Sequence, residues 1–156
     1  VLAPACHRIE VAGSIRRQKS WAHDIEIVCI PKRVVIARDM FTDQVTQSTY
    51  EPRFTNIVMS WPARKGSATG LYTQREVCGQ VLDLFMVNEN NWGLQLAMRT
   101  GSAEYSKWLA ARWVEKGFRS ENGILSRGGI ETCIREEEEL FDVLGIKWAE
   151  PVTREV

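Results

Sequence analysis

The sequence has no apolar run as long as the roughly 18 residues that a membrane-spanning helix needs, and no secretory leader is visible. Its four cysteines are scattered without a CxxC pair. This spacing argues against a zinc site and against a disulfide framework. We therefore expect reduced, buried thiols, Cys29 and Cys78 among them, no membrane partner, and an intracellular, reducing compartment such as the cytoplasm or nucleoid. A virus-encoded protein is compatible with the same features.

The sequence also lacks a net charge, because 20 Lys and Arg residues balance 20 Asp and Glu residues. Overall charge therefore neither favours nor excludes a nucleic-acid partner, and any basic surface must be local. The length of 156 residues, with 44% hydrophobic and 26% charged residues, is typical of one globular domain with a core of its own.

Strand patterns dominate the N-terminal half. The segments RIEVA (8–12) and DIEIVCI (24–30) predict two strands, and LYTQREVCGQVLDLFMV (71–87) predicts a hairpin that turns near Gly79. The segment between these elements is the least legible. There we expect short helices in VVIARDMF (34–41) and RFTNIVMSW (53–61) around a polar loop, and a mobile basic turn in ARKGSATG (63–70).

Helical patterns dominate the C-terminal part. NNWGLQLAMRTG predicts a short helix capped by Asn91 and stopped at Gly101, and the next helix begins at Ser102 and ends at Gly117. The segments ENG, IETCI and REEEELFDVLGIKW predict a hairpin turn, a strand and an acidic-capped helix, so the fold class is α+β. The apolar residues expected to face a core from the second helix are Tyr105, Trp108, Leu109, Trp113 and Val114.

Two acids stand inside the apolar run at 24–30. Side chains two residues apart on a strand point to the same face, so Asp24 and Glu26 project together. Taken alone, a solvated edge strand and a metal site explain them equally well. Asp83 favours the metal site, because it is the only charge in the strand predicted at 81–87 and a buried charge without a partner is costly. Three such acids on neighbouring strands can hold two Mg²⁺ ions about 4 Å apart for phosphoryl transfer.

A phosphate-binding pattern precedes these acids. Gly13 allows backbone N–H groups to approach a phosphate, and Ser14 adds a hydroxyl donor. Arg16 and Arg17 offer planar guanidinium groups that suit phosphate oxygens. Such a turn is common by itself, but it becomes far more specific when a D-x-E strand follows it.

The pattern G-S-x-R-R, a short linker, D-x-E and a later strand acid resembles the nucleotidyltransferase superfamily, in particular the family X DNA polymerases. The segments TGSAEYSKWLAARWVEKGF (100–118) and LFDVLGIKWAEPVTRE (140–155) are similar to the same family. The resemblance implies a nucleotidyltransferase palm at 1–90, with a mixed or antiparallel sheet flanked by helices. It also implies a nucleotide-binding, thumb-like lobe of helices and hairpins at 91–156, without the helix-hairpin-helix or lyase domains of longer members.

The resemblance also assigns roles to individual residues. Its metal ligands and catalytic acids would be Asp24, Glu26 and Asp83, holding two Mg²⁺ ions that Mn²⁺ can replace, with Asp83 nearest the primer 3′-hydroxyl. The residues implied in nucleotide binding are Gly13, Ser14, Arg17, Thr100, Gly101 and Ser102, and Lys107 is implied in DNA binding. Arg112, on the same predicted helix, fits a solvated face and a contact with template-strand phosphates equally well.

The sequence departs from the family at two places near this site. Glu26 stands where these polymerases more often have Asp, and its longer arm shifts the ligand by about a methylene. Met98 and Arg99 replace a Tyr-Phe pair that is typical of members that exclude ribonucleotides. We therefore hypothesise weak discrimination between deoxyribonucleotides and ribonucleotides.

The function implied is metal-dependent transfer of a nucleotide from a nucleoside triphosphate to a primer 3′-hydroxyl, as in a minimal gap-filling or repair polymerase. We expect a monomer that acts on primer-template or gapped DNA, where a DNA-binding partner protein could assist it. Two alternatives remain open at this point. One is a template-independent nucleotidyltransferase for a small molecule, a protein or tRNA, and the other is a catalytically inactive binding domain.

Overall fold

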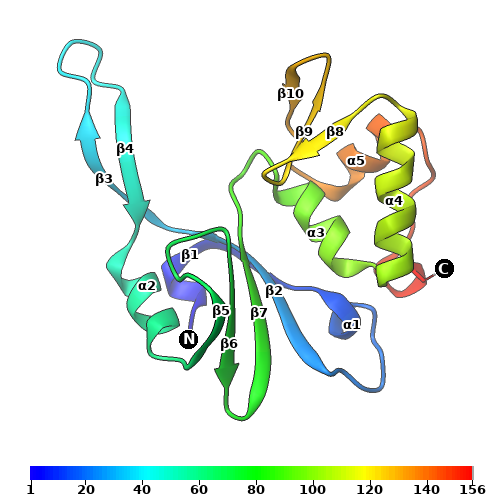
Figure 1. Cartoon of the computed structure of the whole chain (residues 1–156), viewed down its shortest axis with the longest axis horizontal. Helices are drawn as coiled ribbons and strands as arrows, with labels where there is room; N and C mark the ends of the chain where they lie inside the picture. Colours follow the sequence, from blue (N-terminus) through cyan, green and yellow to red (C-terminus); the bar gives the residue numbers. More distant parts are fainter. Residues whose placement is uncertain (156) are drawn as a thin grey trace.

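The computed structural model describes residues 1–155 and contains a five-stranded mixed sheet (Figure 1). The neighbouring inner strands β2 and β7 run parallel, and all other neighbours in this sheet are antiparallel. The α+β class with a mixed sheet is thereby confirmed. In spatial order the strands are β1 (Cys6–Val11), β2 (Asp24–Pro31), β7 (Gln80–Met86), β6 (Tyr72–Val77) and β5 (Ala63–Gly66).

The long connection between β2 and β7 holds most of the elements that differ from expectation. Residues 34–41 do not form a helix, because β3 (Arg33–Arg38) pairs with β4 (Val45–Tyr50) in a separate two-stranded sheet. The β-branched run of β3 fits a strand better than a helix. This hairpin projects from the body of the molecule (Figure 1). The predicted helix at 53–61 is confirmed as α2 (Pro52–Met59).

The predicted mobile turn at 63–70 is also wrong at its start, because β5 pairs with β6. The Thr73 hydroxyl donates to the Lys65 carbonyl at 3.0 Å and fastens this edge strand. The predicted hairpin of β6 and β7 is confirmed, and both residues of its turn, Cys78 and Gly79, have positive φ. Cys78 is consequently exposed, contrary to prediction, whereas Cys29 is buried as expected.

The C-terminal part is helical, with a small three-stranded sheet. The Ser102 Oγ accepts from the Tyr105 backbone N–H at 3.1 Å, which confirms the predicted cap. Asn91 precedes α3 as predicted, but its side chain bonds to Asn88 and Gly123 and does not cap the helix. The elements are α3 (Trp92–Thr100), α4 (Ala103–Glu115), β8 (Arg119–Glu121), β9 (Ile124–Arg127), β10 (Ile130–Thr132), α5 (Glu137–Leu144) and the 3₁₀ turn η2 (Pro151–Thr153).

Three apolar clusters hold these elements together. One packs α2 and the short η1 (Ala3–Ala5) against the sheet, and another fills the C-terminal lobe between α3, α4 and α5. The third joins the two parts, since Trp92 of α3 packs with Val28 and Phe85 of the sheet. Trp113 is buried as predicted, but Val114 is 63% exposed and does not face the core. Among residues 1–155, none of the helices combines the length and apolar character needed to cross a membrane.

Candidate active site

The sheet register brings the three predicted acids onto adjacent strands. Glu26 of β2 lies directly opposite Asp83 of β7 in the parallel ladder, and Asp24 lies two residues earlier on β2. Parallel neighbours lie about 4.8 Å apart and present the same face, so the three carboxylates share one side of the sheet. The spacing of D-x-E predicted the first two, and the β2–β7 pairing supplies the third.

Asp83 is buried and has one of its carboxylate oxygens saturated. The Tyr72 hydroxyl and the Gln74 side-chain amide both donate to Oδ1, the amide at 3.0 Å. Burial, followed by the hydrogen bond to Asp83, raises the pKa of Tyr72 to about 12, so the phenol keeps its proton near neutral pH. Oδ2 accepts no hydrogen bond from residues 1–155. The sequence alone pointed to neither Tyr72 nor Gln74.

Glu26 is the acid of this group whose ionised form is disfavoured. Burial raises the pKa of its carboxyl to about 7, and the nearby charges of Asp24 and Asp83 add to the rise. Its Oε2 also fills the space beside Gly13, where an added Cβ would lie only 1.9 Å from that oxygen. Gly13, at φ +60°, therefore makes room for the Glu26 carboxylate in addition to starting the predicted phosphate turn.

The acids fit a hard divalent cation in donor chemistry and in backbone register. Carboxylate oxygens are the ligands that Mg²⁺ prefers. A cation would relieve the repulsion from Asp24 and Asp83, which adds to the rise that burial causes in the Glu26 pKa. As they stand, no three His, Cys, Asp or Glu side chains of residues 1–155 are gathered closely enough to hold an ion. Glu26 would have to turn from Gly13 toward Asp83 for all three to act together.

Two adjoining cavities open at these acids. The first, of about 440 Å³, lies between the sheet and the C-terminal lobe, and the second, of about 500 Å³, contains Asp83 and Tyr72. Glu26 and Arg99 line both cavities. The residues predicted from sequence that line the first cavity are Ser14, Arg17, Asp24, Glu26, Gly101 and Ser102.

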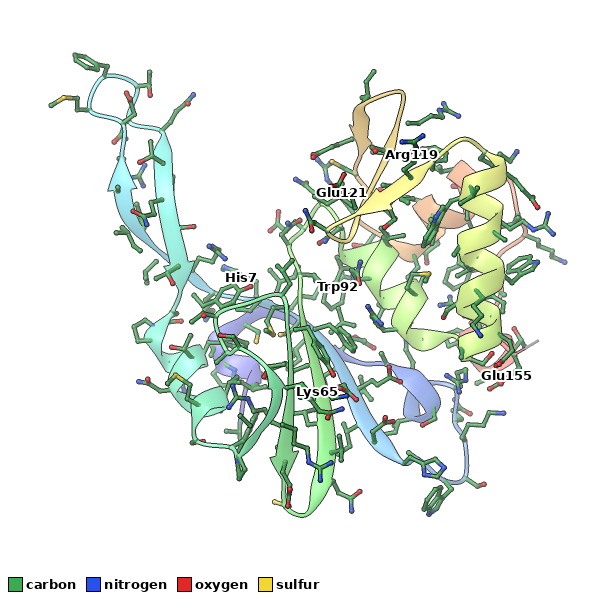
Figure 2. The ribbon with its side chains drawn as sticks, in the orientation of Figure 1. His7, Lys65, Trp92, Arg119, Glu121 and Glu155 are labelled. Carbon is green, nitrogen blue, oxygen red and sulfur yellow. The ribbon has the colours of Figure 1, made fainter. Side chains whose placement is uncertain are left out.

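Arg17 lines the first cavity and is already paired with a carboxylate. Its Nε lies 2.6 Å from Glu155 Oε1, and its Nη1 donates to the Thr100 carbonyl at 2.7 Å. Lys19 also contacts Glu155, at 2.9 Å. Figure 2 shows Glu155 beside the start of α4, on the side that faces α1 (Gly13–Arg16). The arginine and lysine therefore form an oxyanion site that a carboxylate occupies in this conformation.

Arg16 does not join that anion site, contrary to the expectation from sequence. It donates to Glu137 of α5 through two nitrogens, at 2.9 and 2.6 Å, and to the Thr100 hydroxyl at 2.7 Å. Arg154 donates to the same glutamate from the other side. Glu137 and Arg154 are buried and lie far from Arg16 in sequence, so no local pattern could have indicated this network.

Four of the predicted binding residues line neither cavity: Gly13, Thr100, Lys107 and Arg112. Thr100 is fully buried; its hydroxyl accepts from Arg16 and its carbonyl from Arg17. Lys107 is exposed on α4. Arg112 contacts Glu115 at 2.7 Å on the same helix, so part of its charge is already neutralised. Lys107 and Arg112 lie on α4 of the C-terminal lobe and outside both cavities. Only a ligand large enough to extend beyond the cavities would contact them.

Residues 95–155 match the family model described as the DNA polymerase beta thumb. Over 75 residues, 48% of this chain, the sequence is 32% identical to DNA polymerase IV of Saccharomyces cerevisiae. Over part of its length the chain is thus similar to family X-like polymerases. The aligned segment spans 13% of the length of the yeast polymerase. The resemblance to family X DNA polymerases is thereby confirmed, with α3 to α5 and the small sheet as its thumb-like part.

Proposed function

We propose that this family X-like chain catalyses metal-dependent transfer of a nucleotide from a nucleoside triphosphate to the 3′-hydroxyl of a DNA primer. Residues 1–90 would form the nucleotidyltransferase palm and residues 91–156 the nucleotide-binding lobe. The observation that carries the proposal is the parallel β2–β7 register, which sets Glu26 beside Asp83. Glu26 lines both the cavity that contains Asp83 and the adjoining cavity that Ser14 and Arg17 line.

Asp24, Glu26 and Asp83 would hold Mg²⁺, with Mn²⁺ as a substitute. The bound ions would supply charge stabilisation for the phosphoryl group in transfer. Tyr72 and Gln74 fix Asp83 through Oδ1, so that Oδ2 is the oxygen available to the site. Asp83 would thus present Oδ2 to the metal or the primer hydroxyl while Oδ1 stays hydrogen-bonded to Tyr72 and Gln74.

The triphosphate would bind at Ser14 and Arg17, where Glu155 now provides the anion. An oxyanion site that a carboxylate occupies also suits phosphate oxygens, which guanidinium groups bind in the same planar geometry. Gly101 and Ser102 line the same cavity and would contact the sugar and base. The polar, mixed lining fits a charged ligand of nucleotide size.

In the reaction, the primer 3′-oxygen attacks the α-phosphorus of the nucleotide. The bond between that phosphorus and the oxygen bridging to the β-phosphate breaks, and pyrophosphate leaves. The hydroxyl proton passes to Asp83 Oδ2. In-line positioning and charge stabilisation carry most of such a transfer. The DNA would meet the C-terminal lobe, where Lys107 and Arg112 lie on the outer face, and gapped DNA is the substrate we propose for a monomeric repair enzyme.

Extension of a 5′-labelled primer on nicked, gapped and blunt templates, with Mg²⁺ or Mn²⁺, tests the proposal. We expect extension that needs the metal and that Asp83→Asn reduces by at least about 100-fold, because the variant removes one metal ligand and the proton acceptor. Asp142→Asn is the matched control, since Asp142 is an exposed acid on α5 that lines neither cavity of the site.

Extension by Asp142→Asn should equal that of the unmodified chain. Absence of extension on every template, with the protein folded, would refute the polymerase proposal. Extension that Asp83→Asn leaves intact would refute the assignment of the three acids.

A further inference from the structure

Arg99 stands between the two cavities of the site without an ion-pair partner. It belongs to α3, and its guanidinium carbon lies 4.1 Å from the ring centroid of Phe85, two residues after Asp83 on β7. Its side chain is exposed, and with Glu26 it lines both cavities. Within residues 1–155 it forms no ion pair.

The other arginines near the acids are engaged elsewhere. Arg16 is bound to Glu137, and Arg17 is bound to Glu155. Arg99 is therefore the cation at this site whose charge remains for the three carboxylates.

The Phe85 ring explains why this cation stays in place without a direct carboxylate contact. A guanidinium stacked on an aromatic face gains a modest cation–π attraction and keeps its charge accessible. Such a contact holds the group near the acids more weakly than a bidentate ion pair would. The guanidinium can thus be displaced without breaking a buried ion pair.

We propose that Arg99 is the counter-ion of Asp24, Glu26 and Asp83 in the metal-free protein and competes with the divalent cation for them. This rests on the proposed function, in which the three acids hold that cation. Metal binding then has to work against the charge of Arg99, so metal affinity depends on a residue of the C-terminal lobe as well as on the ligands. Arg99 is in this respect a positioning residue and not a metal ligand.

Isothermal titration of the whole chain with Mn²⁺ or Mg²⁺ at low salt tests the competition. A unit charge acting on a dication from about 6 Å in a water-like dielectric changes an equilibrium constant about tenfold. We therefore expect Arg99→Met and Arg99→Gln to bind the metal about tenfold more tightly than the unmodified chain. The gain should shrink as salt is added, because exposed charges are screened.

Two variants serve as controls. Arg99→Lys keeps the charge and should restore nearly the original affinity. Arg127→Met removes an arginine that stacks in the same way on Phe118, at 4.8 Å, but on β9 and outside both cavities, and it should leave the affinity unchanged.

Equal metal affinity in the unmodified chain, Arg99→Met and Arg99→Gln would overturn the competition and leave the proposed metal site standing. Absence of metal binding in every variant, with melting curves that show each to be folded, would overturn the proposed function and this inference with it. Tighter binding in Arg127→Met as well would also overturn the role of Arg99, since the effect would then reflect net charge.

Discussion

Glu137→Gln is expected to destabilise the protein strongly. The glutamate is 5% exposed and lies between Arg16 and the fully buried Arg154. Glutamine has nearly the same shape but no charge, so two guanidinium groups would remain in the interior without a carboxylate. Removing one partner of a buried ion pair costs about 3 to 5 kcal/mol, because the remaining charge has been taken out of water.

That cost is large beside the total stability of about 5 to 15 kcal/mol that a domain usually has. For a chain of this length, each kcal/mol shifts the melting temperature by about 2 to 4 °C, so the expected loss is about 6 to 20 °C. The network also joins α1 to α5 and to the end of α3 through the Thr100 hydroxyl. The variant should therefore loosen the attachment of the C-terminal lobe to the phosphate turn.

Thermal and urea unfolding measure the effect, and the neighbouring glutamate supplies the control. Glu136 forms a bidentate bridge with Arg8 at 2.6 and 2.8 Å, but both side chains are about half exposed. Exposed pairs contribute about 0 to 1 kcal/mol, so Glu136→Gln should cost little. A loss in Glu137→Gln below about 1 kcal/mol, or no larger than in Glu136→Gln, would refute the reasoning from burial.

Three further predictions concern the site itself. Gly13→Ala should lower the free energy of unfolding by about 1 to 3 kcal/mol more than Gly128→Ala does. Both glycines have φ +60°, but only a Cβ at Gly13 would collide with Glu26. Equal unfolding free energies of the two variants would exclude the clash. In metal-free protein the Glu26 pKa is raised to about 7, so the folded state binds the proton of this carboxyl more tightly than the unfolded state does. The stability gained from the protonated carboxyl is therefore fully present below pH 4.5 and is lost as the pH rises through about 7. Glu26→Gln should therefore melt higher than the unmodified chain at pH 8 and lose that advantage at pH 5, and a difference independent of pH would count against this. With Met98 and Arg99 in the cavity, insertion of dNTP and rNTP should differ little in single-nucleotide assays, and a strong dNTP preference would contradict the hypothesis.

Local patterns predicted several elements of the fold well. The Cys78-Gly79 turn, the Ser102 cap and the buried face that includes Trp113 follow from short-range geometry, which a few neighbouring residues determine. The helix predicted at 34–41 is wrong, because a short apolar run does not distinguish a helix from a strand by its period alone. The strand pairing of β3 with β4 joins residues such as Arg33 and Tyr50, which lie too far apart in sequence for a local pattern to indicate.

The sequence by itself determined which chemistry the site can offer: the D-x-E spacing, the isolated acid at Asp83 and the Gly-Ser turn are all properties of short segments. Only the tertiary structure decided how those groups are used. It set Glu26 against both Asp83 and Gly13, assigned Arg16 to Glu137 and Arg17 to Glu155, and left Arg99 stacked on Phe85 beside the acids. The physical reason is that a charge takes its role from its partners, and partners distant in sequence are chosen by strand register and packing.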